Sequence, residues 1–189
     1  MSAVTFAEAG PAAGVPFTVA DLERTPDDGR RYELLDGTLV VSPRPAIGHQ
    51  RVGFRLAYAL EAACPDGLIV VPEPAVQVNS RTELAPDIVV AREDQSQGMK
   101  FTEPPLLVVE VRSPSTALID LNRKKSTYER FGVPSYWIID PDPARPELTV
   151  FELRDGHYGL EAKTTQTITL ERPFPVTIAL ASLTRGLRR

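Results

Sequence analysis

The stretch PLLVVEVRSPST at residues 105–116 has the pattern of a buried strand that ends in charged side chains. Residues 106–109 are all apolar, which is typical of a strand inside a sheet, and Glu110 and Arg112 stand at its end. Because strand side chains alternate between two faces, we expect these two residues on the same face. A carboxylate in a buried strand requires a partner or a bound cation. Arg112 therefore either pairs with Glu110 or contacts an anionic ligand.

A second carboxylate lies at the start of the preceding long apolar segment. Asp87 comes directly after Pro86 and opens the strand-like segment at 86–91. If this strand pairs with the strand of Glu110, the two carboxylates converge. Carboxylate oxygens are the ligands that hard cations such as Mg²⁺ prefer. The alternative is that each carboxylate only ends a strand or caps a loop.

The segment after Glu110 is predicted to form a helix over residues 113–134. Asp120, Lys124 and Tyr128 are spaced four apart, so they form one polar line on a helical face. Since the helix begins just after the strand, this line can lie across the end of the sheet. A lysine there could stabilise negative charge in a transition state or orient an attacking water. The alternative is a solvated surface pair of Asp120 and Lys124, the commonest outcome of this spacing.

Two polar residues earlier in the chain are weaker candidates. Glu33 lies between Tyr32 and Leu34 in a predicted hairpin, on the face opposite Leu34. His49 stands at the start of a predicted helix, where it could bind a phosphate or transfer a proton. It is equally well explained as a helix residue exposed to water.

The remaining segments predict a mixed α/β fold with one central β-sheet flanked by helices. The turn Asp36-Gly37 is the strongest local hairpin signal in the chain. Apolar residues recur at helical spacing from Val52 to Ala63, and Pro65 ends that pattern. The predicted elements are a helix at 17–30, a hairpin at 31–43, a helix at 48–67, strands at 68–72, 75–79, 86–91 and 106–112, a helix at 113–134, a strand at 135–140 and a hairpin at 147–163.

The composition predicts one cytoplasmic domain. The 189 residues are enough for one sizeable core and short for two, so we expect a flexible tail at 1–15 and a single domain at 16–189. A net charge of −4 gives no overall attraction to nucleic acid, so binding would need a local basic patch or a bridging cation. The single cysteine, Cys64, excludes an internal disulfide and fits a reducing compartment. Neither a signal peptide nor a run of about 20 apolar residues is visible.

The motifs together resemble a known group of nucleases. APD at 85–87 followed by VVEVRSPST at 108–116 is similar to the PD-(D/E)XK motif of the restriction-endonuclease-like superfamily. More closely, the chain resembles the Uma family of predicted endonucleases. The matching stretches are YELLDGTLVVSP, GHQRV, PDIVV, VVEVRSPST and DLNRKKSTYERFGVPSYWIIDP, which extend from about residue 31 to 141.

The resemblance implies an endonuclease that hydrolyses DNA with Mg²⁺, or with Mn²⁺ in its place. Asp87 and Glu110 correspond to the metal-binding carboxylates, and Glu33 to an acidic residue that such nucleases often contribute from an early element. The motif calls for lysine two residues after the glutamate, where this chain has Arg112. A lysine from the next helix is thought to replace it in the family, and Lys124 is the candidate. Since arginine keeps its proton, Arg112 is assigned to phosphate contact.

His49 and Tyr128 are predicted, with Arg112, to contact the substrate, and Arg44, Arg51, Arg55, Arg123 and Lys125 to form a basic strip along the DNA backbone. Many nucleases of this type act as two-fold dimers, so a homodimer is expected. Two alternatives stay open. The same fold can serve as a catalytically inactive nucleic-acid-binding or protein-interaction module, which the substitution by Arg112 would fit. It can also hydrolyse a small phosphorylated molecule.

Overall fold

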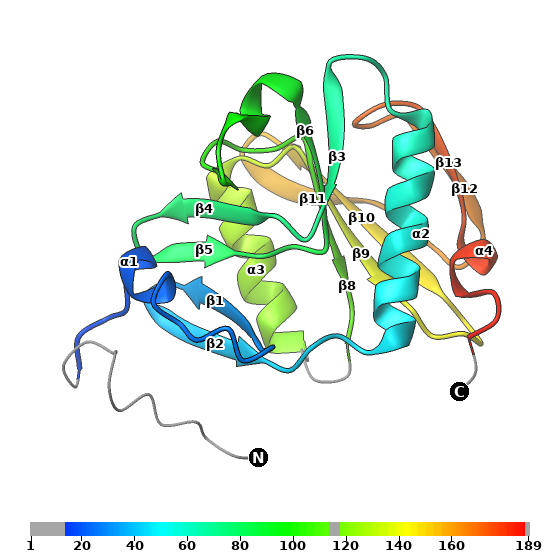
Figure 1. Ribbon diagram of the computed structural model, residues 1–189. Helices are drawn as coiled ribbons and strands as arrows, with labels where there is room; N and C mark the ends of the chain where they lie inside the picture. The colour runs from blue at the N-terminus through cyan, green and yellow to red at the C-terminus, as the bar shows by residue number, and fades with distance from the viewer. Residues whose placement is uncertain (1–13, 114–117, 188–189) are drawn as a thin grey trace.

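A computed structural model describes residues 14–113 and 118–187 (Figure 1). The helices are α1 (Val19–Leu22), α2 (Ile47–Ala63), α3 (Leu118–Phe131) and α4 (Leu180–Thr184), with a 3₁₀ turn η1 (Glu93–Gln97). The strands are β1 (Arg31–Leu35), β2 (Thr38–Ser42), β3 (Leu68–Pro72), β4 (Ala75–Asn79), β5 (Thr82–Leu84), β6 (Ile88–Arg92), β7 (Lys100–Phe101), β8 (Leu107–Val111), β9 (Ser135–Asp140), β10 (Glu147–Arg154), β11 (His157–Thr164), β12 (Thr167–Leu170) and β13 (Val176–Ala179).

A six-stranded mixed sheet is the centre of the fold. Its order is β11-β10-β9-β8-β6-β3, in which β8 and β9 run parallel and the other neighbours run antiparallel. All five residues of β8 and the first four of β6 are buried. Covered on both faces, these strands need apolar residues at successive positions instead of alternating ones. This explains the unbroken apolar run that ends at Glu110.

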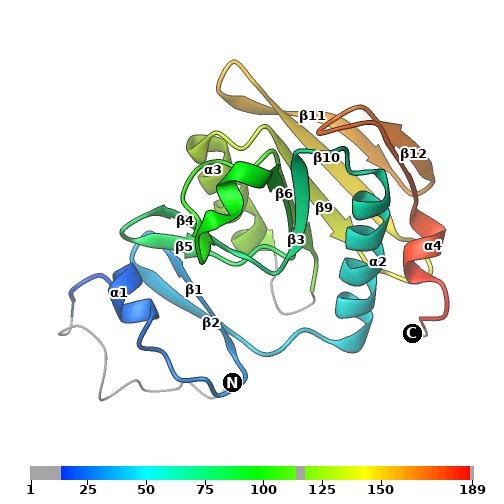
Figure 2. The same cartoon turned by 45° about the horizontal axis from the view of Figure 1, so that its top comes forward.

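A second sheet packs beside the first and carries the hairpin. Its order is β2-β1-β5-β4-β7, with β1 and β2 in antiparallel register from Arg31↔Ser42 to Leu35↔Thr38. The hairpin turns at Asp36 and Gly37, whose φ angles are +51° and +77°. Two consecutive positive φ angles match the twist of a two-residue hairpin loop, which is why an Asp-Gly pair stands here. Figure 2 shows this hairpin extending away from the six-stranded sheet.

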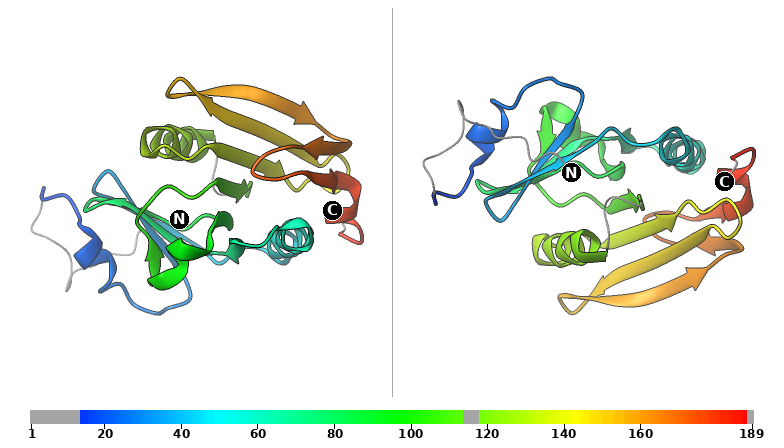
Figure 3. Two further views of the ribbon diagram at one scale, coloured as in Figure 1. Left: turned by 90° about the horizontal axis from the view of Figure 1, so that it is seen from above. Right: turned by 90° about the horizontal axis from the view of Figure 1, so that it is seen from below.

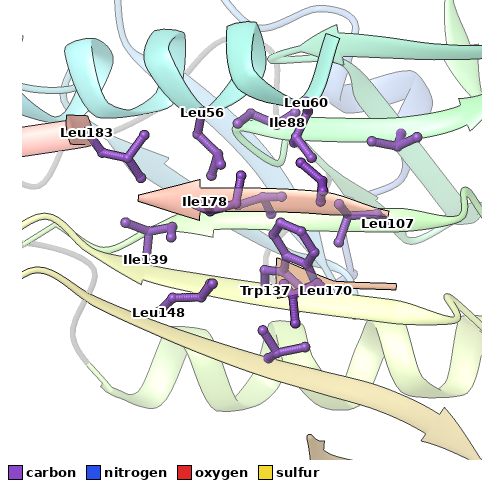
Figure 4. Close-up of a cluster of buried hydrophobic side chains, with 14 of the residues drawn as sticks. Leu56, Leu60, Ile88, Leu107, Trp137, Ile139, Leu148, Leu170, Ile178 and Leu183 are labelled. Carbon is purple, nitrogen blue, oxygen red and sulfur yellow. The ribbon is translucent and has the colours of Figure 1, made fainter. Parts of the chain in front are cut away.

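The two faces of the six-stranded sheet have different covers. Helix α2, the hairpin β12–β13 and α4 pack on one face, and α3 and the second sheet pack on the other (Figure 3). On the first face, the side chains of α2 meet those of β6, β8, β9, β10 and β13 in one apolar cluster (Figure 4). Val52, Leu56 and Leu60 of α2 are fully buried there, as their helical spacing predicts.

The predicted fold class is confirmed, but the helix predicted at 17–30 covers only Val19–Leu22 and the helix predicted at 48–67 ends at Ala63. The structure adds β5, β7, β12 and β13, so the described chain contains three sheets where the sequence predicts one. Short strands are set by their partners more than by their own sequence, which explains why the pattern misses them. Ser115 and Thr116, either of which could cap the start of the helix predicted at 113–134, lie outside the described residues. No described helix is long and apolar enough to cross a membrane.

Replacing Leu56 by alanine tests the packing of α2 on the sheet. Leu56 is fully buried, so we expect Leu56→Ala to lower the free energy of unfolding by about 2–5 kcal/mol. Leu160→Ala is the matched control, because Leu160 is 61% exposed and should cost little. Urea denaturation followed by circular dichroism measures both. Equal losses in the two variants would contradict the packing described.

Candidate active site

Asp87 and Glu110 meet at one edge of the six-stranded sheet. Strands β6 and β8 pair antiparallel with Ile88 opposite Val109, so the start of β6 lies beside the end of β8. The Asp87 amide donates to the Val109 carbonyl at 3.1 Å. Both carboxylate residues are 5% exposed. The expected pairing of the two strands is therefore present, and it places two buried carboxylates side by side.

The ammonium of Lys124 lies between Glu110 and Glu33. Its Nζ donates to Oε1 and Oε2 of Glu33 at 2.9 and 3.0 Å and lies 3.3 and 3.4 Å from the two oxygens of Glu110. The lysine is only 4% exposed. The polar line on α3 is therefore turned inward at Lys124 instead of forming a solvated surface pair. The side chain of Asp120 lies outside the described residues.

Two further contacts hold these carboxylates in place. The hydroxyl of Tyr128, one turn after Lys124, donates to Oε1 of Glu110 at 3.1 Å. The amide of Ala85 donates to Oε1 of Glu33 at 2.8 Å. Tyr128 is fully buried, so its contact with Glu110 positions the carboxylate. Its predicted contact with substrate stays a prediction.

Asp87, Glu110, Glu33 and Lys124 form a charged cluster, and Arg31 is a further member that the sequence analysis missed. Its Nη1 donates to Oδ1 of Asp87 at 3.1 Å, and its Nη2 lies 3.9 Å from Oε1 of Glu33. Nη2 is buried and has no hydrogen-bond acceptor among the described residues. The alternation of β1 contains the signal, because Arg31 and Glu33 are two apart and share a face. Arg31 thus supplies the second permanent positive charge among the carboxylates.

His49 connects helix α2 to the cluster. Its Nε2 lies 2.8 Å from the Val111 carbonyl and 3.4 Å from Oδ2 of Asp87, and a carbonyl only accepts, so Nε2 carries a proton. Burial disfavours the imidazolium, but the hydrogen bond and charge of Asp87 outweigh it and raise the pKa of His49. Burial also opposes ionisation of Asp87, yet His49 and Arg31 keep the pKa of Asp87 below its ordinary value.

Glu110 and Lys124 respond differently to their burial. Burial raises the pKa of Glu110 to about 7, since the nearby charges of Asp87 and Glu33 offset much of the attraction of Lys124. Burial disfavours the ammonium of Lys124, but Glu110 and Glu33 together outweigh it and raise the pKa of Lys124. Lys124 is therefore charged at neutral pH, and Glu110 is the member of the cluster poised to gain or lose a proton.

Arg112 points to a different partner. Its Nη1 donates to Oδ2 of Asp140 at 2.6 Å, at the end of the neighbouring strand β9, and its side chain is 43% exposed. No ion pair joins Arg112 to the carboxylates in the described part of the chain. The guanidinium within the cluster comes from Arg31 instead. A phosphate contact by Arg112 stays a prediction.

Three of the basic residues proposed as a DNA-binding strip make contacts within the protein in different places, and the strip itself stays a prediction. Arg44 donates to the Gly29 carbonyl, Arg55 to the carbonyls of Leu183 and Arg185, and Lys125 lies over the ring of Phe151.

The ligand types of the cluster fit a hard divalent cation. Asp87 and Glu110 offer carboxylate oxygens from adjacent strands, and three buried carboxylates face two permanent cations, Lys124 and Arg31. Burial, together with the negative charges of Asp87 and Glu33, raises the pKa of Glu110, and a bound cation would favour its ionised form. Within residues 14–113 and 118–187, however, no three histidine, cysteine or carboxylate side chains are already arranged as a metal site. Lys124 lies closer to the oxygens of Glu33, at 2.9 and 3.0 Å, than to those of Glu110, at 3.3 and 3.4 Å, so Asp87 and Glu110 are the better candidate ligands.

Comparisons with known proteins identify the family and the fold. The model of the Uma2 family, described as "Putative restriction endonuclease", matches residues 19–183. The chain belongs to this family. A solved structure, that of a putative nuclease belonging to DUF820 from Anabaena variabilis ATCC 29413, matches with a TM-score of 0.72 at 15% identity, over 89% of this chain and 98% of that one. This likeness shows the shared fold. A search of curated proteins gives no match. The family resemblance drawn from the sequence is confirmed.

Removing the ammonium of Lys124 should destabilise the protein strongly. Lys124→Met leaves Glu33 and Glu110 buried without their cation, and loss of one partner of a buried ion pair costs about 3–5 kcal/mol. Lys163→Met is the control, because Lys163 pairs with Glu147 at an exposed position. Urea denaturation compares the two, and adding Glu33→Gln to Lys124→Met should restore part of the loss. A Lys124 variant as stable as the Lys163 variant would refute the buried cluster.

The pKa of Glu110 predicts a pH dependence of stability. Because the folded-state pKa is raised from 4.5 to about 7, the folded protein binds the proton more tightly than the unfolded chain. This contribution to stability is present below pH 4.5 and is lost as the pH rises through about 7. The free energy of unfolding of wild type minus that of Glu110→Gln should therefore fall across this interval, and urea titrations at successive pH values measure it. A flat or rising difference would contradict the assignment.

Proposed function

We propose that the protein is a metal-dependent endonuclease that hydrolyses phosphodiester bonds in DNA. One observation carries the proposal: Asp87, Glu110 and Lys124 converge at one edge of the central sheet, where β6 begins and β8 ends. Membership of a family described as "Putative restriction endonuclease" supports the same reaction class. Two carboxylates with a neighbouring lysine are the groups that water attack on a phosphodiester requires.

Asp87 and Glu110 would hold the divalent cation, Mg²⁺ or Mn²⁺. When bound, such an ion polarises a phosphate oxygen and lowers the pKa of a coordinated water. The chain itself prepares these ligands: Arg31 and His49 keep Asp87 ionised, and Tyr128 orients Glu110. Glu33, an expected metal ligand, is better suited to hold the ammonium of Lys124.

Lys124 and Arg31 are proposed to stabilise the charge that develops on the phosphate. The pKa of Lys124 is raised, so it acts as a fixed positive charge and not as a proton donor. Nη2 of Arg31 is a buried donor without an acceptor in the described structure, which a phosphate oxygen would satisfy. Arg112, paired with Asp140 outside the cluster, is the less direct candidate for this role.

Action in the cytoplasm and as a homodimer completes the proposal. The single cysteine fits a reducing compartment, and cutting both strands of a duplex requires two sites.

The closed state of the cluster favours one alternative, a catalytically inactive module. Lys124 contacts all four oxygens of Glu33 and Glu110, and the carboxylates of Asp87 and Glu110 are nearly excluded from solvent. If this arrangement only stabilises the fold, no metal is required. The two readings therefore differ in metal binding, which is measurable without any assumption about the substrate.

Metal binding and cleavage should be lost together in variants of the carboxylates. We expect wild type to bind Mn²⁺ in calorimetry and to nick plasmid, branched or single-stranded DNA, and both properties to fall at least about 100-fold in Asp87→Asn and Glu110→Gln. Bis(p-nitrophenyl) phosphate serves as a small substrate, so that a small-molecule phosphohydrolase is recognised. Circular dichroism confirms that each variant is folded. Folded wild type that neither binds metal nor cuts any substrate would refute the nuclease and favour the inactive module.

Paired substitutions distinguish the two candidate guanidiniums. Arg31→Met should lower kcat by about 10- to 1000-fold, because it removes a donor aimed at developing charge, whereas Arg112→Met should have a much smaller effect. The carboxylates remain in both variants, and Mn²⁺ affinity is measured alongside. A larger loss in Arg112→Met would return the phosphate contact to Arg112.

A further inference from the structure

A groove of about 400 Å³ between α2 and β3 opens directly beside the carboxylate cluster. His49 and Asp87 close one end of it, and Val70, Pro72 and Glu73 form the wall opposite the helix. In Figure 1, α2 and β3 lie next to each other. The groove is thus continuous with the site to which the nuclease chemistry is assigned.

The helix side of the groove is a single stripe of α2 with a hollow in the middle. Gln50, Gly53, Phe54, Ala57, Tyr58 and Glu61 line it, at spacings of three and four residues. Phe54 and Tyr58 are 72% and 70% exposed, so two aromatic rings stand unburied one turn apart. Their exposure has no explanation in the packing of the core, since the buried stripe of α2 is on its other side.

Gly53 makes the hollow, and the fold does not require it. A Cβ added at Gly53 would meet no atom within 4 Å, and its φ is not positive. Glycine inside a helix costs about 1 kcal/mol relative to alanine, so a glycine without a steric or conformational reason lowers stability. The space that it leaves opens onto the groove, which Gly53 lines between Gln50 and Ala57 on α2.

The lining selects a flat, uncharged and aromatic ligand. No lysine or arginine lines the groove within the described residues, and Glu61, Glu73 and Asp87 would repel a phosphate. Exposed aromatic rings stack on nucleobases, and carboxylate and amide oxygens accept hydrogen bonds from base amino groups. A base inside a duplex cannot reach such a groove, because it is stacked between its neighbours.

We propose that this groove binds one unpaired nucleobase of the substrate strand, next to the phosphodiester that the site of Asp87, Glu110 and Lys124 is proposed to cleave. This inference rests on the proposed nuclease function and gives it a substrate class: single-stranded, flapped or otherwise unpaired DNA. Phe54 and Tyr58 stack on the base, Gly53 makes room for it, and the absence of cations in the lining leaves the phosphates to Lys124 and Arg31.

The test fills the groove without removing any contact of the fold. Gly53→Leu places a side chain in the hollow and replaces glycine in a helix, so the variant should be at least as stable as wild type. Ala62→Leu is the control, because Ala62 is exposed on α2 and is not part of the groove lining. Thermal unfolding of both variants establishes that they are folded. Phe54→Ala with Tyr58→Ala removes the stacking rings as an independent variant.

Binding is measured by fluorescence anisotropy with labelled oligothymidylate and with a duplex of the same length, with Ca²⁺ in place of Mg²⁺ or Mn²⁺. Gel electrophoresis after each titration confirms that the strands remain intact. We expect wild type to prefer the single strand, and Gly53→Leu and the double alanine variant to weaken that binding by about ten-fold, with Ala62→Leu unchanged. Placing one abasic site in the strand should reproduce part of the loss. Unchanged single-strand binding in Gly53→Leu would overturn the proposal.

The same variants separate failure of the groove from failure of the nuclease. Cleavage of DNA by wild type that Gly53→Leu leaves unaltered refutes the base site and retains the nuclease. Single-strand binding that Gly53→Leu abolishes, without cleavage by wild type, retains the base site and refutes the catalytic function. Light scattering tests whether a second copy of the chain occupies the groove. A wild-type dimer that becomes monomeric in Gly53→Leu would assign the groove to the dimer interface and overturn the proposal of a nucleobase site.

Discussion

The ammonium of Lys124 between Glu33 and Glu110 is the interaction on which the site depends. It joins three elements that are distant in the sequence: β1 of the second sheet, β8 of the central sheet and α3. Burying a charge costs several kcal/mol, and only close oppositely charged partners offset that cost. Here one ammonium faces two carboxylates, and Arg31 and His49 together offset the cost of burying the charge of Asp87. The hairpin, the strand end and the helix are therefore constrained to meet at one point.

Such a cluster contributes little to the stability of a fold, because removing its charges from water costs free energy. Apolar residues of similar volume often stabilise a core as well as or better than a buried ion pair. The apolar clusters on both faces of the sheet already provide extensive packing around β6 and β8. Stability alone therefore does not explain why charged groups stand at this edge, whereas a role in chemistry would. The raised pKa of Glu110 points the same way, because perturbed carboxyl groups gather at functional sites.

The sequence predicted the parts of this site that depend on local pattern. Apolar runs predicted β6 and β8 with Asp87 and Glu110 at their ends, and the Asp-Gly turn predicted the hairpin. Helical spacing together with the family resemblance pointed to Lys124 on the following helix. The sequence could not predict which neighbouring strand or helix each side chain meets in the folded protein. Arg112 follows Glu110 by two residues, yet β8 ends between them and the side chain meets Asp140 on the next strand.

Arg31 shows the opposite case. It shares a strand face with Glu33, but β1 belongs to a different sheet from β6 and β8, so no local pattern brings it to Asp87. Likewise β12 and β13 are four residues each and are defined by pairing with one another. Periodicity over so short a span does not distinguish a strand from a loop.

His49 belongs both to the charged cluster and to the lining of the groove. Its ring is held by the Val111 carbonyl and by Asp87, while its helix carries the exposed rings of Phe54 and Tyr58. A ligand that stacks on α2 and a phosphate that approaches Asp87 would therefore act on the same rigid helix and the same strand edge. Preorganisation of this kind needs no moving lid, since α2 is anchored by Val52, Leu56 and Leu60 along its opposite side. The position of the groove beside His49 follows from which face of α2 the core leaves uncovered.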